Sequence, residues 1–461
     1  MILTKYKLGE ILDVTRGASL SGEYYATEGE YIRLTCGNFD YQNNCFKENK
    51  SKDNLYYVGD FKSEFLMEEG DIITPLTEQA IGLLGSTAII PESGKYIQSQ
   101  DVAKIICKED LLDKDFAFYL ISSALVKQQL SAAAQQTKIR HTSPDKIKDC
   151  TVWIPELSEQ KRIGKLLRSI DRKIELNRAI NQNLEAMAKQ LYDYWFVQFD
   201  FPDENGRPYK SSGGEMVWNE KLKRKIPASW ENKNIEDIAD VYNGATPSTI
   251  NEQNYGGDIV WITPKDLSDQ KQKFVYQGER NISQAGYNSC STHLLPPNTI
   301  LMSSRAPIGL LSIAKTELCT NQGFKSFVPK AENISTYLYY YLNIHIKQIE
   351  QLGTGTTFKE VSREDVLKFP ILKPSDAILD LWEKQVSALN NKQFVIQKEN
   401  EFLTKQRDEL LPLLMNGQVS VNSDLLACIL SYILISVYRN LGIISFAGNL
   451  PINTKTTISR L

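Results

Sequence analysis

The side chains that most often carry out chemistry in proteins are few in this chain and poorly spaced for catalysis. The 461 residues include three histidines and seven cysteines without a CxxC pair, so neither a metal cluster nor a nucleophilic triad has usable spacing. Gly353–Thr357 looks like a phosphate-binding loop, but it lacks a third glycine and a strand-helix turn. Cofactor fingerprints, a GxxxxGK[ST] loop and an Asn/Asp-Pro-Pro-aromatic motif are absent from the sequence. We therefore expect no catalysis, no metal and no resident cofactor.

The elements that position polar side chains occur twice along the chain. Leu8–Val14 recurs as Ile235–Val241, and Ile81–Leu84 recurs as Ile308–Leu311, with the same spacing in both pairs. Farther along, the spacing between the copies is smaller, so the second copy is shorter by about eight residues. Solenoid repeats recur every ~20–50 residues, so this much longer repeat instead indicates two related domains, each with its own core.

Each copy begins with a mixed part in which short β-rich runs are followed by a helical run. The β-rich runs include Thr87–Ile90, Val102–Ile106 and Ile259–Thr263, and the helical runs cover Asp115–Ala134 and Ser335–Leu352. Glycine, proline and asparagine separate them. The pattern predicts an α+β fold for each copy.

A long helix with a seven-residue apolar period follows each copy. Two coiled-coil seams of about 40 residues, hence about 60 Å, are predicted. The residues expected to pair the helices and set their register are Ile163, Leu167, Ile170, Ile174, Asn181 and Leu184 in the first helix, and Trp382, Val386, Leu389, Ile396, Asn400 and Leu403 in the second. Asn181 aligns with Asn400, and buried amides in such a seam fix register. Two alternatives stay open: helices that pack only on their own domains, and amides that face solvent.

Chain order predicts how such helices would pair. The first helix leads into the second mixed domain, which leads into the second helix, so helices paired along their length run antiparallel. One domain would then lie at each end of the rod, related by an approximate two-fold axis. Domains separated by about one DNA turn, ~34 Å, or more could read two separated, inverted half-sites.

Several runs in this order resemble the specificity subunits of type I restriction-modification systems, over residues 1 to about 421. They are Glu159–Leu167, Ile170–Asn177, Tyr194–Pro202, Val241–Pro247, Ser303–Gly309 and Leu410–Val419. The resemblance implies a non-catalytic subunit whose two target-recognition domains bind double-stranded DNA. It also implies that two helices dock two methyltransferase subunits, and that restriction subunits join through the methyltransferase. AdoMet, ATP and Mg would be bound by those partners, which flip out adenines.

Candidate DNA contacts are polar and basic residues in the loops of the two mixed domains, because phosphates and base edges are bound by such side chains. They are Arg16, Asn38, Thr77, Gln79, Gln100, Thr137, Lys138 and Arg140 in the first domain, and Thr246, Ser248, Lys265, Arg305, Lys325, Thr356, Thr357 and Lys359 in the second. A solvated surface role is the alternative for each. Gln135–His141 and Gly353–Lys359 are favoured, since both lie at one repeat position before a long helix.

The two copies differ where these candidates lie. Thr15–Leu20 lacks the Thr-Pro found in the second copy, and Thr77–Ala80 stands where Ser304–Pro307 does. Such differences predict two different half-sites and therefore an asymmetric bipartite target.

The predicted architecture is two repeated mixed α/β target-recognition domains separated by two long antiparallel coiled-coil helices with pseudo-two-fold symmetry. The expected boundaries are domain 1 at 1–157, a central helix at 158–199, a polar linker at 200–228, domain 2 at 229–375, a distal helix at 376–418 and a tail at 419–461. The basic run at 221–225 either meets a phosphate backbone or is solvated. The apolar run at 425–437 is shorter than the ~20 residues that span a bilayer.

Net charge and cysteine usage indicate in which compartment and with which partners the protein works. A net charge of −3 lacks the bulk basic signal of a free-standing DNA binder, which indicates that partners share the affinity. The odd cysteine number, with no secretory leader before it, favours the cytoplasm without a membrane anchor. A DNA-free coiled-coil scaffold presenting two protein-binding domains is the alternative function, and a solitary methyltransferase with a degenerate motif comes third.

Overall fold

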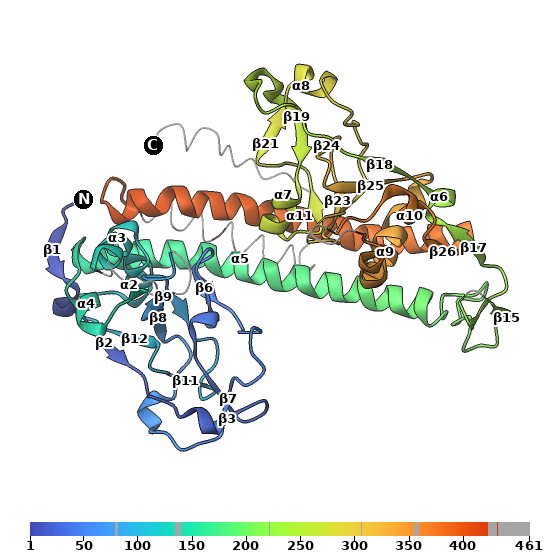
Figure 1. Cartoon of the computed structure of the whole chain (residues 1–461). Helices are drawn as coiled ribbons and strands as arrows, with labels where there is room; N and C mark the ends of the chain where they lie inside the picture. The colour runs from blue at the N-terminus through green and yellow to red at the C-terminus, as the bar shows by residue number, and fades with distance from the viewer. Residues whose placement is uncertain are drawn as a thin grey trace. The chain divides into compact units, whose positions relative to one another are not determined.

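The computed structural model describes residues 1–78, 82–133, 140–220, 222–305, 307–354 and 359–422, together with Ser431. The chain forms two compact units, whose elements Figure 1 labels. The first unit comprises residues 1–176 with the described residues from Asn400 on, and the second comprises Asn177–Glu399. Both long helices contribute one segment to each unit.

The first unit is built on a four-stranded sheet with the strand order β10-β8-β12-β2. Its strands are β2 (Leu12–Arg16), β8 (Ile72–Pro75), β10 (Ala88–Ile89) and β12 (Val102–Cys107). A second sheet of order β11-β4-β7-β3 contains β3 (Tyr25–Ala26), β4 (Tyr31–Arg33), β7 (Tyr56–Tyr57) and β11 (Tyr96–Ile97). The other described strands of the first unit form three pairs: β1 (Thr4–Lys7) with β14 (Thr151–Ile154), β5 (Phe39–Asp40) with β6 (Cys45–Phe46), and β9 (Thr77–Glu78) with β13 (Arg140–His141).

The helices of the recognition part of this unit are α1 (Leu8–Ile11), α2 (Lys114–Ile121), α3 (Ala124–Ala133) and α4 (Pro144–Lys148). The single helical run expected at 115–134 is therefore two helices. Ser122 Oγ donates to the carbonyl of Phe118 at 3.1 Å, and Ser123 Oγ accepts from the amide of Val126 at 3.4 Å. These serine side chains bond backbone groups at the break, which accounts for the interruption.

The second unit is built on a five-stranded sheet with the order β18-β25-β22-β23-β20. Its strands are β18 (Ala239–Asn243), β20 (Phe274–Val275), β22 (Ile300–Ser303), β23 (Leu311–Ala314) and β25 (Phe324–Pro329). The other strands are β19 (Tyr255–Ile262), β21 (Arg280–Ile282) and β24 (Cys319–Thr320) in one sheet, β15 (Met216–Asn219) with β16 (Arg224–Pro227), and β17 (Glu231–Asn234) with β26 (Pro370–Lys373). The helices are α6 (Ile235–Ile238), α7 (Pro264–Gln270), α8 (Gln284–Asn288), α9 (Ser335–Gln351) and α10 (Arg363–Leu367).

The main sheets of the two units repeat one another. β2, β12, β8 and β10 follow the same order as β18, β25, β22 and β23, and the first three strands of each set pair antiparallel. Arg16 lies opposite Ala103 in one sheet, and Asn243 lies opposite Lys325 in the other. The expected mixture of helix and sheet is confirmed, and the shared strand order agrees with the sequence repeat.

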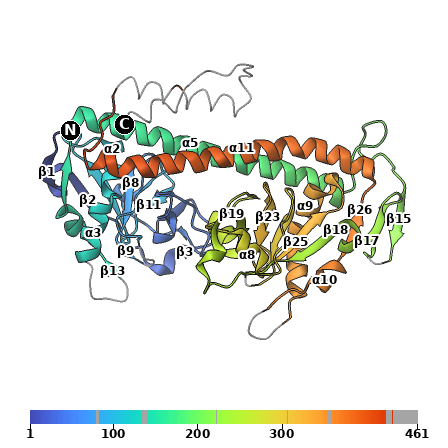
Figure 2. The same cartoon turned by 90° about the horizontal axis from the view of Figure 1, so that it is seen from above.

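The two long helices are α5 (Leu157–Tyr192), which ends in a wider turn at Asp193–Val197, and α11 (Asp376–Met415). Figure 2 shows both helices with the strands of each unit. Inside the second unit, Asn177 Nδ2 donates to Glu399 at 2.8 Å and Asn181 Nδ2 donates to the carbonyl of Gln393 at 3.2 Å. Residue numbers rise along α5 as they fall along α11, so these two segments run antiparallel.

Most of the predicted pairing residues are buried. These are Ile163, Leu167, Ile170, Ile174, Leu184, Trp382, Val386, Ile396 and Leu403. Leu389, Asn181 and Asn400 are half-buried. Ile163 clusters with Phe116 of α2, and Trp382 clusters with Leu338 of α9. In each unit, buried residues of the helix segments therefore pack on the recognition part.

In the part of the chain that the structure describes, no helix has the length and apolar character needed to cross a bilayer. Apart from Ser431, the predicted apolar run at 425–437 lies outside the described residues.

Candidate nucleic-acid interface

In the first unit, four of the predicted contact residues are linked at one end of the main sheet. Arg16 closes β2, and its Nε donates to the carbonyl of Gln100 at 2.8 Å. The next residue, Asp101, accepts from Thr77 Oγ1 at 3.4 Å. Thr77 pairs with His141, and Arg140 lies beside it on β13. Residues 16, 77, 100 and 140 therefore belong to one cluster, called here the first strand-end cluster.

Arg140 is oriented by a buried carboxylate in this cluster. Its Nη1 lies 3.4 Å from Glu78 Oε2, and the Glu78 side chain is almost fully buried. The other oxygen of Glu78 accepts from the amide of Gly82 at 2.8 Å. The Arg140 side chain is 39% exposed, so it can meet a ligand while the carboxylate holds its position.

A glycine holds the Gln100 loop against β2. A Cβ at Gly17 would lie 2.2 Å from the carbonyl oxygen of Gln98, which is closer than any atom pair tolerates. The amide of Ala18 donates to that carbonyl at 2.9 Å. The close approach places the exposed Gln100 side chain next to Arg16.

The second unit has a cluster equivalent to the first strand-end cluster, but its side chains are different. Arg305 Nε donates to Glu360 Oε2 at 2.9 Å, and Lys325 Nζ donates to the other oxygen of Glu360 at 3.2 Å. Burial raises the pKa of Glu360, but the hydrogen bonds from Lys325 and Arg305 outweigh it and hold that pKa below its ordinary value. Lys359 is exposed beside this carboxylate. Residues 305, 325, 359 and 360 form the second strand-end cluster.

A glycine holds the second cluster in the same way as the first. A Cβ at Gly244 would lie 2.2 Å from the carbonyl oxygen of Thr320, which accepts from the amide of Ala245 at 3.0 Å. By this shared bond Gln98 is equivalent to Thr320, so Gln100 is equivalent to Gln322. Gln322 is exposed, and its Oε1 accepts from the hydroxyl of Thr246.

Gln322 was not among the predicted contacts. The sequence spacing from Gln100 to Gln322 is smaller than the spacing of the preceding repeat, Ile81–Leu84 with Ile308–Leu311. A comparison of Gln98–Asp101 with Thr320–Gly323, allowing that smaller spacing, would have found it.

Backbone bonds correct the sequence alignment of the two clusters by one position. The amide of Thr142 donates to the carbonyl of Leu76, and the amide of Val361 donates to the carbonyl of Ser304. Leu76 is therefore equivalent to Ser304, and Thr77 to Arg305, one residue away from the alignment expected from the repeat.

The remaining candidates lie outside the two clusters or beyond the described residues. Asn38 is buried, and its side chain bonds Thr35 and Lys47. Ser248 is exposed, and Lys265 is exposed in an ion pair with Glu279 at 2.8 Å. Gln79, Thr137, Lys138, Thr356 and Thr357 lie outside the described residues.

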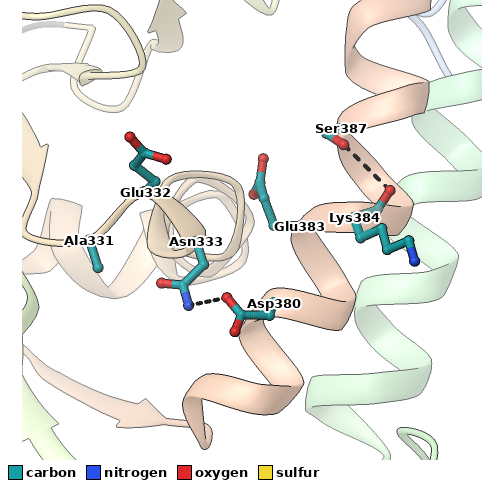
Figure 3. Close-up of a pocket in the computed structure, with 7 residues that line it drawn as sticks. All are labelled: Ala331, Glu332, Asn333, Asp380, Glu383, Lys384 and Ser387. Atoms are coloured by element: carbon teal, nitrogen blue, oxygen red, sulfur yellow. Dashed lines mark hydrogen bonds between the residues drawn. The ribbon is translucent and has the colours of Figure 1, made fainter.

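One hollow of the second unit has the wrong charge for a phosphate backbone. Figure 3 shows its lining residues beside α11. Its volume is about 420 Å³. Asn333 Nδ2 donates to Asp380 at 2.7 Å across it. Its lining residues are Ala331, Glu332, Asn333, Asp380, Glu383, Lys384 and Ser387. Three carboxylates against one ammonium disfavour an anionic ligand here.

Among the described residues, no group of three or more His, Cys, Asp or Glu side chains is arranged to hold a metal ion. The two strand-end clusters combine guanidinium, ammonium, amide and hydroxyl groups at loops. These are the groups that contact phosphates and read base edges.

Comparison with known proteins gives a consistent result. The model of the family described as type I restriction modification DNA specificity domain matches residues 3–186 and 227–401. The type I restriction enzyme MjaIX specificity subunit of Methanocaldococcus jannaschii is 38% identical over 192 residues, which cover 40% of this chain and 44% of that protein. The chain thus aligns with less than half of that relative.

Two further similarities cover more of the chain. The type I restriction enzyme HindI specificity subunit of Haemophilus influenzae is 27% identical over 377 residues, 70% of this chain and 81% of that protein. The crystal structure of a type I restriction-modification S subunit from M. genitalium has a TM-score of 0.59 at 16% identity, covering 90% of this chain and 96% of that one. The last comparison shows a shared fold.

Proposed function

This chain belongs to the type I restriction-modification DNA specificity family, and on that premise we propose that its two units bind the two halves of one asymmetric DNA target. Membership in the family confirms the expected role in DNA specificity and supports a subunit without catalytic activity of its own. It does not favour the DNA-free scaffold.

The observation that carries the proposal is the pair of strand-end clusters. Both units present an exposed glutamine, Gln100 or Gln322, beside a glycine-held strand end. At the neighbouring equivalent positions, Thr77 and His141 of one unit are replaced by Arg305 and Glu360 in the other. Shared positions suit a common binding mode, and different side chains suit different base sequences.

The domain plan that we propose keeps the boundaries expected from the sequence. Target-recognition domains occupy 1–157 and 229–375, the central and distal helices occupy 158–199 and 376–418, and a linker and tail occupy 200–228 and 419–461. The two helices form one antiparallel coiled coil that relates the domains by an approximate two-fold axis. The antiparallel order of Asn177–Glu399 and Asn181–Gln393 supports this plan.

The assembly we propose contains double-stranded DNA, two methyltransferase subunits and restriction subunits joined through them, in the cytoplasm. An exposed apolar stripe on α11 supports docking of the methyltransferase. Leu381, Val395 and Phe402 are 43%, 58% and 55% exposed and are separated by multiples of seven residues. Apolar side chains left exposed along one face of a helix suit a protein interaction surface.

Selection from a random duplex library tests the proposal. The full chain is mixed with its methyltransferase subunit, and the bound duplexes are sequenced at several salt concentrations. Enrichment of a split motif with a constant gap and two different halves is expected. No enrichment at any salt concentration would refute the proposal, and methylation by the chain alone would favour an enzyme instead.

A further inference from the structure

Each unit contains one buried network of charged and polar side chains that ties both long helices to a tyrosine of its recognition domain. In the first unit, Asp171 of α5 accepts from the hydroxyl of Tyr119 on α2 and, at 2.9 Å, from Arg407 of α11. Asp171 and Arg407 are each 8% exposed. Burial, and then the charge of Asp171, raise the pKa of Tyr119, so its hydroxyl keeps the proton that it donates.

In the second unit, the centre of the network is Lys273, just before β20. Its Nζ donates to Glu185 of α5 at 2.7 Å, to Asn390 of α11 at 2.8 Å and to the hydroxyl of Tyr340 on α9 at 2.6 Å. The Tyr340 hydroxyl in turn donates to Glu185 at 3.1 Å. The Lys273 side chain is 10% exposed, so Glu185 is the main compensation for its charge.

The two networks occupy equivalent places but do not repeat their charges. Tyr119 and Tyr340 lie at the same distance from the starts of α2 and α9. Asp171 corresponds to Asn390 at the spacing of the helix repeat, which is also the spacing from Ile163 to Trp382. At that spacing, Glu185 corresponds to Thr404 and Arg407 corresponds to Ala188. Both carboxylates are therefore on α5, and the arginine is on α11.

This distribution penalises pairing of α5 with the α5 of a second copy. In the same antiparallel geometry, Asp171 would face Ala188 where Arg407 now lies, with Glu185 close by on the same helix. A buried carboxylate that loses its hydrogen-bonded cation and gains a second carboxylate nearby is unfavourable.

Pairing of α11 with a second α11 is penalised for the opposite reason. Thr404 would replace Glu185, so Lys273 would lose its carboxylate. Arg407 would replace Ala188 on the same helix, which brings a second cation near Lys273. Of the three possible helix pairs, α5 with α11 is the one that matches the charges of these two networks with their opposites.

We propose that the two networks are a pairing code, which makes α5 pair with α11 and excludes pairing of either helix with its own copy in a second chain. The code keeps two different recognition domains in one molecule. The pairing code determines only which helices pair. An experiment can therefore refute it without refuting the proposed DNA recognition, and the proposed DNA recognition can be refuted without refuting the pairing code.

A cysteine crosslink on the full chain distinguishes the helix pairs. Side-chain hydrogen bonds place Asp171 opposite Arg407 and Asn177 opposite Glu399. In an α5–α5 pair of the same register, the half-buried Arg178, next to Asn177 on α5, would lie close to its own copy. The full chain carrying Arg178→Cys is refolded from denaturant and mildly oxidised, and the covalent dimer is quantified. The chain without the added cysteine gives the background.

Neutralising the networks is expected to raise that dimer at least about tenfold. The variant carries Asp171→Asn with Arg407→Met and Glu185→Gln with Lys273→Met; replacing a buried ion pair by groups of similar volume is often tolerated. The control carries Lys405→Met with Glu409→Gln, an exposed pair on α11, and should match the parent chain.

Circular dichroism checks that each variant folds. If the fourfold variant does not fold, the test uses two variants that each neutralise one network, Asp171→Asn with Arg407→Met and Glu185→Gln with Lys273→Met. An unchanged dimer fraction in every folded network variant would overturn the pairing code. So would a parent chain that already dimerises to the level of the variants.

Discussion

At the scale of single residues, recognition depends on side chains that the fold brings to one place in each unit. Arg16, Thr77 and Arg140 come from three distant parts of the first domain. A side-chain hydrogen bond from Arg16 and the pairing of β9 with β13 hold them in one cluster. In the second domain, Glu360 collects Arg305 and Lys325. A carboxylate in a DNA interface is useful when it orients cations or accepts from a cytosine amine.

Replacing Arg305 by alanine should relax one half-site and leave the other unchanged. Loss of a base-reading arginine costs about 1–3 kcal/mol at the position that it reads. Competition binding with duplexes mutated in either half measures the effect. Lys233→Ala, which removes a cation from an exposed pair with Glu231 on β17, is the control. Equal relaxation of both halves would contradict this assignment of Arg305.

Glu360→Gln should lower the melting temperature at neutral pH but not at low pH. The folded pKa of Glu360 is depressed, so its ion pairs stabilise the protein above the ordinary pKa of a glutamate, about 4.3, and this contribution is lost as pH falls through the folded value. Thermal melts of both chains from pH 7 to about pH 3 should therefore converge. A constant difference across this range would show that the charge of Glu360 has no part in stability.

At the scale of elements, close backbone approach positions the reading loops. Gly17 and Gly244 each allow the end of a sheet strand to touch the loop that carries a glutamine. The short spacing between Gln98 O and a Cβ at residue 17 leaves no room for adjustment, because the contacting atom belongs to the backbone.

Gly17→Ala should weaken recognition of one half-site by displacing the Gln100 loop. The added methyl would meet the carbonyls of Gln98 and Ser99, so the loop must move. Gly22→Ala is the matched control, since its Cβ would meet only a ring carbon of Tyr25 at 3.9 Å. Library selection with both variants measures the half-sites, and intact recognition by Gly17→Ala would show that the loop does not contact DNA.

The exposed stripe of α11 should be needed for partner binding rather than for folding. Val395→Asp and Phe402→Asp are expected to weaken capture of the methyltransferase subunit by about tenfold or more, because a charge in an apolar interface must be desolvated. Asn391→Asp, also exposed on α11, should bind as the parent chain does. Unchanged capture by both stripe variants would place the docking surface elsewhere.

At the scale of the whole molecule, the proposed coiled coil acts as a ruler between two reading sites. A heptad adds about 10.5 Å of helix, which corresponds to about three base pairs of DNA. The ruler and the readers are then separate parts, and each can be changed without the other.

Removing one heptad from α5 between Asp171 and Glu185, and one from α11 between Gln393 and Arg407, should shorten the gap by about three base pairs. Both buried networks stay intact in this variant, because the deletions lie between them. Library selection should return the parent half-sites at the new spacing. Altered half-sites at the old spacing would refute the ruler.

Local patterns in the sequence determined the repeat, the α+β content, the two long helices and the family. Each of these depends on residue order within one segment, such as the heptads around Ile163 and Trp382, or on motifs that recur at a constant spacing. The absence of catalytic motifs was equally local. Such features survive in the sequence because neighbours along the chain are also neighbours in a helix or strand.

Only the tertiary structure decided which polar side chains meet. Backbone hydrogen bonds at Thr320 and Gln98 show that Gln322 is equivalent to Gln100. Backbone hydrogen bonds also show that Thr77 is equivalent to Arg305. Lys273 donates to Glu185 and Asn390, which lie on two helices far away in the sequence. Strand pairing and helix packing determine which of these side chains meet, even where insertions change the spacing between the two copies. Counting residues between repeats therefore does not reveal these contacts.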